Sequence, residues 1–154
     1  MCATLRDGLH TRGFDVTTKT VAEEALDVVA SAEFDVVVTD LRMQGMSGLE
    51  LCGRINQERP DIPVIVITAF GSLDTAIGAI RSGAYDFITK PVEIEHLAVT
   101  LGRAIDHRAL REEVKRLRQA VAETQLFEGI IGESAVMHKL NDMINRAAAA
   151  DASV

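Results

Sequence analysis

The chain has 154 residues, of which 47% are hydrophobic and 25% charged, and its 16 basic and 23 acidic side chains give a net charge of −7. This ordinary globular composition excludes wholesale disorder, and the acidic balance disfavours nucleic-acid binding over the whole surface. Only 4% of the residues are aromatic and none is Trp. An aliphatic core of this kind suits a buried parallel sheet flanked by helices.

The two cysteines, Cys2 and Cys52, lie far apart and lack metal-ligand spacing. Neither a disulfide framework nor a zinc site is therefore expected. No apolar run approaches the roughly 18 residues that cross a bilayer, and no signal-peptide pattern opens the sequence. We therefore expect a soluble, cytoplasmic protein with no membrane partner.

The first 40 residues alternate between helical and extended patterns. A helix is predicted over Cys2–Arg12, with Gly13 ending it in the left-handed conformation. Residues Phe14–Thr18 alternate and are rich in β-branched side chains, which predicts a short strand. Residues 21–29 return to the helical period. Asp35–Asp40 is an apolar run ending in a carboxylate, as expected of a strand covered on both faces.

A loop is predicted over residues 41–48, and after it helical and extended patterns continue to alternate as far as the 120s. The predicted elements are a helix at Leu49–Glu58, a strand at Pro63–Thr68, a helix at Leu73–Arg81, a strand at Tyr85–Thr89 and a helix from Glu93 onward. Strands that alternate with helices at these intervals predict a doubly wound α/β fold with a parallel sheet and right-handed crossovers.

The last helix changes its apolar phase along its length. Its first part presents one face to the domain through Ile94, Leu97, Leu101, Ala104 and Ile105. Its second part repeats at the 4-3-4 spacing of a coiled coil through Leu110, Val114, Leu117 and Val121. We predict a change of partner near His107 and a homodimer held by the second stripe. The basic tract Arg103–Arg118 is interpreted as a solvated helix surface in preference to a nucleic-acid contact.

Three polar side chains follow apolar runs at the ends of predicted strands, namely Asp40, Thr68 and Lys90. The carboxyl ends of strands form the ligand site of an open α/β sheet. A carboxylate beside a hydroxyl and an ammonium would bind a divalent cation, or act as a nucleophile whose acyl-phosphate product the other two hold. The alternative is that all three are exposed loop residues.

Three segments resemble, in order and in spacing, the signatures of the response-regulator receiver domain of two-component signalling. They are Asp35–Gly48, Ile67–Gly71 and Gly83–Pro91. The resemblance implies a flavodoxin-like sheet, a regulatory protein that is not an enzyme, and a sensor histidine kinase as partner. It also implies that the Lys90–Pro91 peptide is cis, which proline permits.

The resemblance assigns a role to each polar side chain. Asp40 is the phospho-acceptor, Thr68 the hydroxyl that moves toward the phosphoryl group, Lys90 its ion-pair partner and Phe87 the aromatic switch. Phosphorylation adds charge and acceptor oxygens at Asp40, which would draw Thr68 and Lys90 inward and let Phe87 fill the vacated space. The face that this biases comprises the helix after Thr68, the strand at Tyr85–Thr89 and the helix from Glu93.

The sequence departs from the receiver pattern at its start. The family opens with a strand that ends in paired acids and helps to hold Mg²⁺, and that strand is missing here. With only Asp40 and the backbone carbonyl of Met43 as ligands, Mg²⁺ is expected to bind weakly or not at all. Either Phe14–Thr18 pairs directly with a neighbouring strand, or another segment or a second chain fills the gap. Gln44 replaces a proline of the family, which should loosen the loop.

A second resemblance covers the end of the chain. Residues Phe127–Ser134 and the Ala-rich stretch after them are similar to the opening of the AAA+ domain in NtrC-type activators of sigma-54-dependent transcription. No phosphate-binding loop of the form G-x-x-x-x-G-K-[ST] occurs, so ATP hydrolysis is not expected. The predicted divisions are a receiver domain over 1–107, a helical linker over 108–126 and an AAA+ fragment over 127–154.

Two functional hypotheses follow. The first is a two-component response regulator whose phosphorylation controls a sigma-54-dependent activator through dimerisation, its intact parent binding DNA and sigma-54 RNA polymerase. The alternative is a degenerate receiver that accepts no phosphate and serves as a protein–protein interaction module. A hydrolase or dehydrogenase is disfavoured because the sequence has neither a nucleophile elbow nor a glycine fingerprint.

Overall fold

A computed structural model describes residues 2–69 and 73–130, with side chains for all of these except 73–76 and 123–130. The chain divides into two compact units, Met1–Arg111 and Glu112–Val154. In chain order the elements are α1 (Cys2–His10), α2 (Ala22–Ser31), β1 (Val37–Asp40), α3 (Gly48–Glu58), β2 (Val64–Thr68), α4 (Leu73–Arg81), β3 (Asp86–Thr89) and α5 (Ile94–Ile130).

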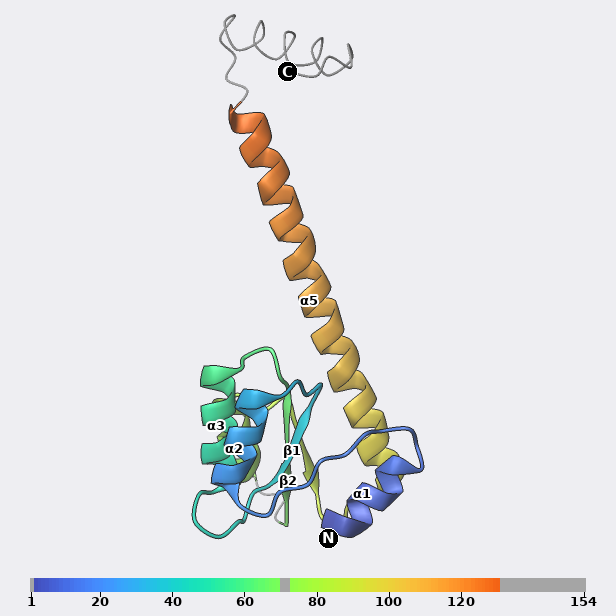
Figure 1. Cartoon of the computed structure of the whole chain (residues 1–154). Helices are drawn as coiled ribbons and strands as arrows, with labels where there is room; N and C mark the ends of the chain where they lie inside the picture. The colour runs from blue at the N-terminus through green and yellow to red at the C-terminus, as the bar shows by residue number, and fades with distance from the viewer. Residues whose placement is uncertain (1, 70–72, 131–154) are drawn as a thin grey trace, which may run out of the picture. The chain divides into compact units, whose positions relative to one another are not determined.

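The strands form one parallel sheet in the order β1-β2-β3 (Figure 1). Asp40 of β1 lies opposite Ile67 of β2, and Thr68 of β2 lies opposite Thr89 of β3. Every residue of the central strand β2 is buried, as its apolar sequence requires. The prediction of a doubly wound parallel α/β fold is therefore confirmed, and the carboxyl ends of the strands meet at one edge.

Aliphatic cores cover both faces of the sheet. Helices α2 and α3 lie on one face, and α1 and the first turns of α5 lie on the other (Figure 1). The buried members of the α2–α3 core include Val29, Leu51, Ile55, Val64 and Val66. Those of the α1–α5 core include Leu9, Ile65, Ile88, Leu97 and Leu101. Burial of each such side chain contributes about 1.5–3 kcal/mol, so these layers are the main stabilising feature of the unit.

The predicted strand at Phe14–Thr18 is wrong, because the structure has no regular element there. Its side-chain alternation is nevertheless meaningful, since Phe14 and Val16 pack against the α1–α5 core. The Phe14 N–H donates to the Leu9 carbonyl at 3.3 Å instead of joining a ladder. Within the described residues β1 pairs only with β2, so direct pairing by this segment does not occur. Filling of the gap by another segment or a second chain stays a prediction.

Local signals set the helix boundaries. Ser47 caps α3 by a capping box, in which its hydroxyl accepts from the Glu50 N–H and the Glu50 carboxylate accepts from the Ser47 N–H. That backbone hydrogen bond lowers the pKa of Glu50. Gly13 follows α1 with a φ of 85°, and Gly83 follows α4 with a φ of 81°, so both occupy the conformation expected of residues that end helices.

Helix α5 starts at Ile94 and extends to Ile130. The sequence predicts a helical pattern into the 120s, and the helix continues through residues 127–130, where the predicted AAA+ fragment begins. The rest of the proposed AAA+ fragment lies outside the described residues. Among those residues no helix has the length and apolarity that a membrane span requires.

Charged residues form an ion-pair cluster beside the amino ends of β1 and β2. We call it the amino-edge cluster; its members are Glu33, Asp35, Arg59, Asp61 and Arg108. The Arg108 guanidinium, whose side chain is only 11% exposed, contacts Asp35 at 2.9 Å, Asp61 at 3.2 Å and Glu33 at 3.3 Å. Arg59 donates to both carboxylate oxygens of Asp61, each at 3.1 Å, and this hydrogen bonding lowers the pKa of Asp61. The cluster therefore ties α5 to the segments that precede β1 and β2.

Candidate functional site

Asp40 ends β1 and points into an ion pair with Lys90, which directly follows β3. The Lys90 ammonium donates to one carboxylate oxygen of Asp40, and the Arg42 backbone N–H donates to the other at 3.1 Å. The side chains of Asp40 and Lys90 are 19% and 30% exposed. The pair is thus sheltered but still reachable from solvent, as a reactive group must be.

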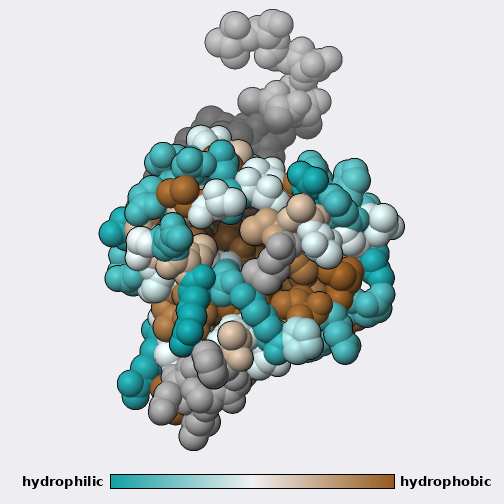
Figure 2. Space-filling view, turned by 90° about the horizontal axis from the view of Figure 1, so that it is seen from below, coloured by the Kyte–Doolittle hydropathy of each residue, from teal (hydrophilic) through white to brown (hydrophobic). Residues whose placement is uncertain are grey.

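Thr68 ends β2, the strand between those that carry Asp40 and Lys90. Because Asp40 lies opposite Ile67, Thr68 stands one residue beyond it along the neighbouring strand. The Lys90 N–H donates to the Thr68 carbonyl at 2.8 Å, and Thr68 itself is only 1% exposed. The structure therefore brings the three predicted site residues to adjacent strand ends. Figure 2 looks onto this edge, where apolar residues (brown) lie among polar ones (teal).

The loop after β1 packs tightly against the backbone of Asp40. The Gly48 N–H donates to the Leu41 carbonyl at 3.0 Å. A Cβ atom on Gly48 would stand 2.1 Å from the Asp40 carbonyl oxygen. This role of Gly48 was not predicted from the sequence, although a glycine directly after the N-cap serine is the available signal. Close approach here fixes the loop and hence the direction of Asp40.

Met43 and Met46 act as apolar anchors of the same loop. Both are half-buried and pack against the α2–α3 core. The Thr39 hydroxyl donates to the Met43 sulfur at 3.7 Å. These contacts place the two methionine side chains in packing roles, as the flexible thioether suits an irregular gap.

Phe87 lies on β3 opposite Val66, is half-buried and packs against the α2–α3 core. Its predicted role as a switch stays a prediction. The Lys90–Pro91 peptide is cis, as the resemblance implies.

The side chains present do not fit a Mg²⁺ site by themselves. Among the described residues no group of three or more His, Cys, Asp or Glu side chains is placed to hold a metal ion. Asp40 supplies one carboxylate, and both of its oxygens already accept hydrogen bonds. Mg²⁺ prefers an octahedron of oxygen ligands, so Asp40 with a backbone carbonyl such as that of Met43 leaves most positions to water.

The arrangement suits an acceptor of anionic groups. The Asp40 carboxylate is a nucleophile of the class that forms acyl phosphates, and the neighbouring ammonium is a fixed positive charge for phosphoryl oxygens. The buried hydroxyl of Thr68 adds a donor at the neighbouring strand end. Nothing in the packing of β1, β2 or β3 calls for this combination of side chains.

The amino-edge cluster was not predicted from the sequence either. Asp35 and Asp61 stand just before apolar strands, which hinted at their position, but no local pattern pairs them with Arg108. Those partners are 73 and 47 residues away in sequence. Only the fold brings them together.

Comparison with known families gives one assignment for most of the chain. The family model described as "Response regulator receiver domain" matches residues 1–101. This range includes Asp40, Thr68 and Lys90, and it covers about two thirds of the chain.

Two relatives are transcriptional regulators by name. The transcriptional regulatory protein ZraR of Klebsiella oxytoca is 36% identical over 99% of this chain and 33% of its own length. The C4-dicarboxylate transport transcriptional regulatory protein DctD of Pseudomonas aeruginosa is 38% identical over 97% of this chain and 33% of its own length. The chain thus spans about a third of the length of these curated relatives.

Solved structures agree on the fold. A response regulator receiver domain protein from Clostridium thermocellum superposes with a TM-score of 0.67 at 31% identity, covering 71% of this chain and 88% of that one. NtrX from Brucella abortus in complex with ADP gives a TM-score of 0.71 at 31% identity, covering 94% of this chain and 31% of that one.

Proposed function

Because this chain belongs to the response-regulator receiver family, we propose that Asp40 is its phospho-acceptor and that a sensor histidine kinase is the donor. The observation that carries the proposal is the ion pair between Asp40 and Lys90 at the carboxyl edge of the sheet, beside Thr68. Its chemistry is that of a nucleophile already facing the cation that will neutralise its product.

The reaction is a phosphoryl transfer. A carboxylate oxygen of Asp40 attacks the phosphorus of the donor, and the bond from phosphorus to the leaving group breaks with its electron pair. The Lys90 ammonium then pairs with the phosphoryl oxygens, and the Thr68 hydroxyl donates to them. No step here passes through Mg²⁺, because the described side chains do not fit it.

The phosphoryl group acts as a switch by drawing Thr68 and Lys90 toward it, with Phe87 filling the space behind Thr68. The output face comprises α4, β3 and α5. On it the side chains of Ile77, Ile80 and Val99 are 37%, 68% and 62% exposed. The face therefore leaves large apolar side chains in water, where a partner would cover them. We propose that this face and the α5 stripe hold the homodimer.

In the whole protein, this part is the regulatory segment of a sigma-54-dependent transcriptional activator in the cytoplasm. The names of ZraR and DctD as transcriptional regulators support this assignment. DNA and sigma-54 RNA polymerase are then partners of the parent protein, and the present segment regulates without hydrolysing ATP.

The test is intact-mass measurement after incubation with acetyl phosphate in a Mg²⁺ buffer. We expect a gain of one phosphoryl group in the wild type and none in Asp40→Asn. Because the described residues hold no metal-binding group of three or more side chains, the same assay is also run on a version extended by a first strand with two acids. A gain in both wild-type and Asp40→Asn samples contradicts the proposal.

The alternative is a degenerate receiver that works through protein contacts alone. It is favoured by one observation, the lack of a metal-holding cluster among the described residues. Absence of any mass gain in the extended version selects this alternative.

A further inference from the structure

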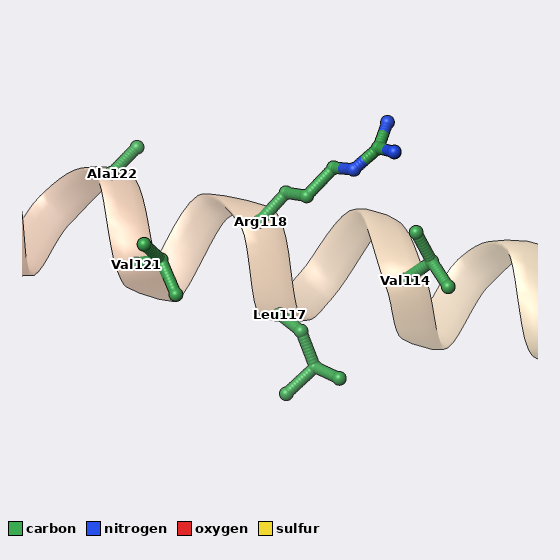
Figure 3. A pocket seen from close by; sticks show the side chains of 5 residues that line it. All are labelled: Val114, Leu117, Arg118, Val121 and Ala122. Carbon is green, nitrogen blue, oxygen red and sulfur yellow. The ribbon is translucent and has the colours of Figure 1, made fainter.

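The first unit has a surface hollow of about 120 Å³ next to the amino-edge cluster. We call it the Tyr85 hollow, and its lining includes Asn56, Pro60, Asp61, Tyr85, His107 and Arg111. A larger hollow of about 320 Å³ lies on α5, but its lining includes Val114, Leu117 and Val121 of the stripe that the proposed homodimer covers (Figure 3). The two hollows share no residue, and the chemistry proposed for Asp40 uses neither.

Three segments that are distant in sequence form the Tyr85 hollow. Asn56 comes from α3, and residues 60–63 come from the loop that leads to β2. Tyr85 stands just before β3. His107 and Arg111 are four residues apart on α5, so their side chains lie on one face of that helix. A ligand in the hollow would therefore contact α5 and two other segments at once.

The apolar wall of the hollow is held in place. The Tyr85 hydroxyl donates to the Arg103 carbonyl at 3.2 Å, and the Tyr85 N–H donates to the Val64 carbonyl at 2.8 Å. The rings of Tyr85 and His107 lie 5.3 Å apart, tilted by 43°. Ile62, which is only 3% exposed, also lines the hollow. These side chains offer a short hydrocarbon chain a surface on which to leave water.

Two polar side chains of the hollow are available to a ligand. In the part of the chain that the structure describes, Asn56 and Arg111 form no side-chain hydrogen bond or ion pair. The Asn56 amide lies against Gly83, where a Cβ atom would stand 2.2 Å from Asn56 Nδ2. Glycine thus leaves room for an amide that the packing does not use. Guanidinium and amide N–H groups are both donors to a carboxylate.

The acid in the hollow does not exclude an anion. Both carboxylate oxygens of Asp61 accept from Arg59 at 3.1 Å, and Arg108 contacts one of them at 3.2 Å. Two guanidinium groups therefore compensate its charge. The other two acids of the amino-edge cluster do not line the hollow, and their side chains are 80% and 70% exposed, so water screens them. Arg111 is left as the charge that faces a ligand.

We propose that the Tyr85 hollow binds a small carboxylate anion with a short apolar chain. The Arg111 guanidinium pairs with the carboxylate through its planar fork, the Asn56 amide donates to one carboxylate oxygen, and the chain lies against Tyr85. A space of about 120 Å³ has the volume of roughly four water molecules in the liquid, which suits a ligand of the size of butyrate. Binding here does not depend on phosphorylation of Asp40.

The test is a titration of the isotope-labelled full chain with sodium butyrate at constant ionic strength, followed by amide NMR shifts. We expect saturable shifts at the Asn56 side-chain amide and at His107, with a dissociation constant on the order of a millimolar. Arg111→Gln should weaken binding by about tenfold, because the charge and the fork are both lost. A response that does not saturate, or that Arg111→Gln leaves unchanged, overturns the proposal.

Two further variants separate a built site from general charge attraction. Lys115→Gln removes one positive charge a helical turn beyond Arg111 and outside the hollow, and it should change the affinity by less than about twofold. Arg111→Lys should fall between the wild type and Arg111→Gln, because an ammonium keeps the charge and loses the fork. Equal weakening by Lys115→Gln and Arg111→Gln would contradict the proposal.

Two other probes define the ligand class. Butylamine has a similar chain with the opposite charge, and it should cause no saturable shift at Asn56. Inorganic phosphate has the negative charge without the chain, and it should bind at least about tenfold more weakly than butyrate. Butylamine shifts that match those of butyrate, or phosphate binding as tight as butyrate binding, would overturn the assignment of a carboxylate with an apolar chain.

Discussion

The two ends of the sheet use charge in opposite ways. At the carboxyl edge one carboxylate, Asp40, faces one ammonium, Lys90. At the amino edge two arginines and three acids share their hydrogen bonds, and Glu33 and Asp61 each contact both guanidinium groups. The same strands, β1 and β2, end in one region and begin near the other.

This contrast distinguishes a reactive charged group from charged groups that hold the fold. The members of the amino-edge cluster are already engaged with one another, and within the cluster Asp35 contacts Arg108 alone, so removing Arg108 takes away the partner that Asp35 has there. Asp40 and Lys90 form a single pair at the end of two strands, where a phosphoryl group can insert between them. We expect loss of a charged side chain to affect mainly stability in the first region and mainly function in the second.

The largest effect on stability is expected from Gly48→Ala at the carboxyl edge. Its Cβ would stand 2.1 Å from the Asp40 carbonyl oxygen, which is backbone and has little room to move. We expect the free energy of unfolding to fall by about 3 kcal/mol, as for a substitution that forces overpacking. Denaturant unfolding measures it. Gly53→Ala is the matched control, since nothing lies within 4 Å of its Cβ. A loss below that of the control would show that backbone contact does not hold this loop.

The next effect is expected from Arg108→Gln at the amino edge. The substitution removes hydrogen bonds to three carboxylates from a side chain that is 11% exposed. We expect a loss of about 2 kcal/mol in the free energy of unfolding, and little change in phosphorylation of Asp40. Chemical denaturation and the mass assay are read on the same sample. A free energy of unfolding equal to that of the wild type would show that the amino-edge cluster does not stabilise the fold.

Stability should also depend on pH through Asp61. Hydrogen bonding to Arg59 lowers its folded pKa, so Asp61 stabilises the fold above its unfolded pKa of about 4. That contribution is lost as the pH falls through the lowered folded value. We expect the unfolding free energy of the wild type to drop as the pH falls from about 5 through the lowered folded pKa of Asp61, and Asp61→Asn to show a shallower drop. Parallel pH profiles would contradict the assigned role of Asp61.

The smallest effect is expected from Arg59→Lys. The charge stays, but the two parallel hydrogen bonds to Asp61 are lost, since an ammonium cannot reproduce the planar fork. We expect a small loss in the free energy of unfolding, less than for Arg59→Ala. Thermal melts of both variants give the comparison, and equal costs would mean that charge alone matters.

The sequence allowed the chain order of the regular elements to be predicted because their apolar periods are local. β2 and α3 are clear cases, since a run of buried β-branched residues and a serine-capped amphipathic helix carry their own signals. The prediction of a strand at Phe14–Thr18 was wrong because a strand needs a paired neighbour, and alternation of side chains alone does not supply one. Its side chains still pack as the pattern predicts.

The candidate site was predictable for a related reason. Asp40, Thr68 and Lys90 interrupt apolar runs, and the rule that parallel strands share a carboxyl edge brings them together without knowledge of the fold in detail. The contacts of Arg108 and the close approach of Gly48 to Asp40 depend instead on tertiary distances. Neither has a periodic signal in the sequence.

The position of the modified residue tests most directly whether Asp40 is the phospho-acceptor. After treatment with acetyl phosphate, borohydride reduces an acyl phosphate to the alcohol, and peptide mass spectrometry then locates the change. We predict homoserine at position 40 and unmodified side chains at Asp35 and Asp61. Modification at either of those aspartates, or equal labelling of all three, would contradict the account.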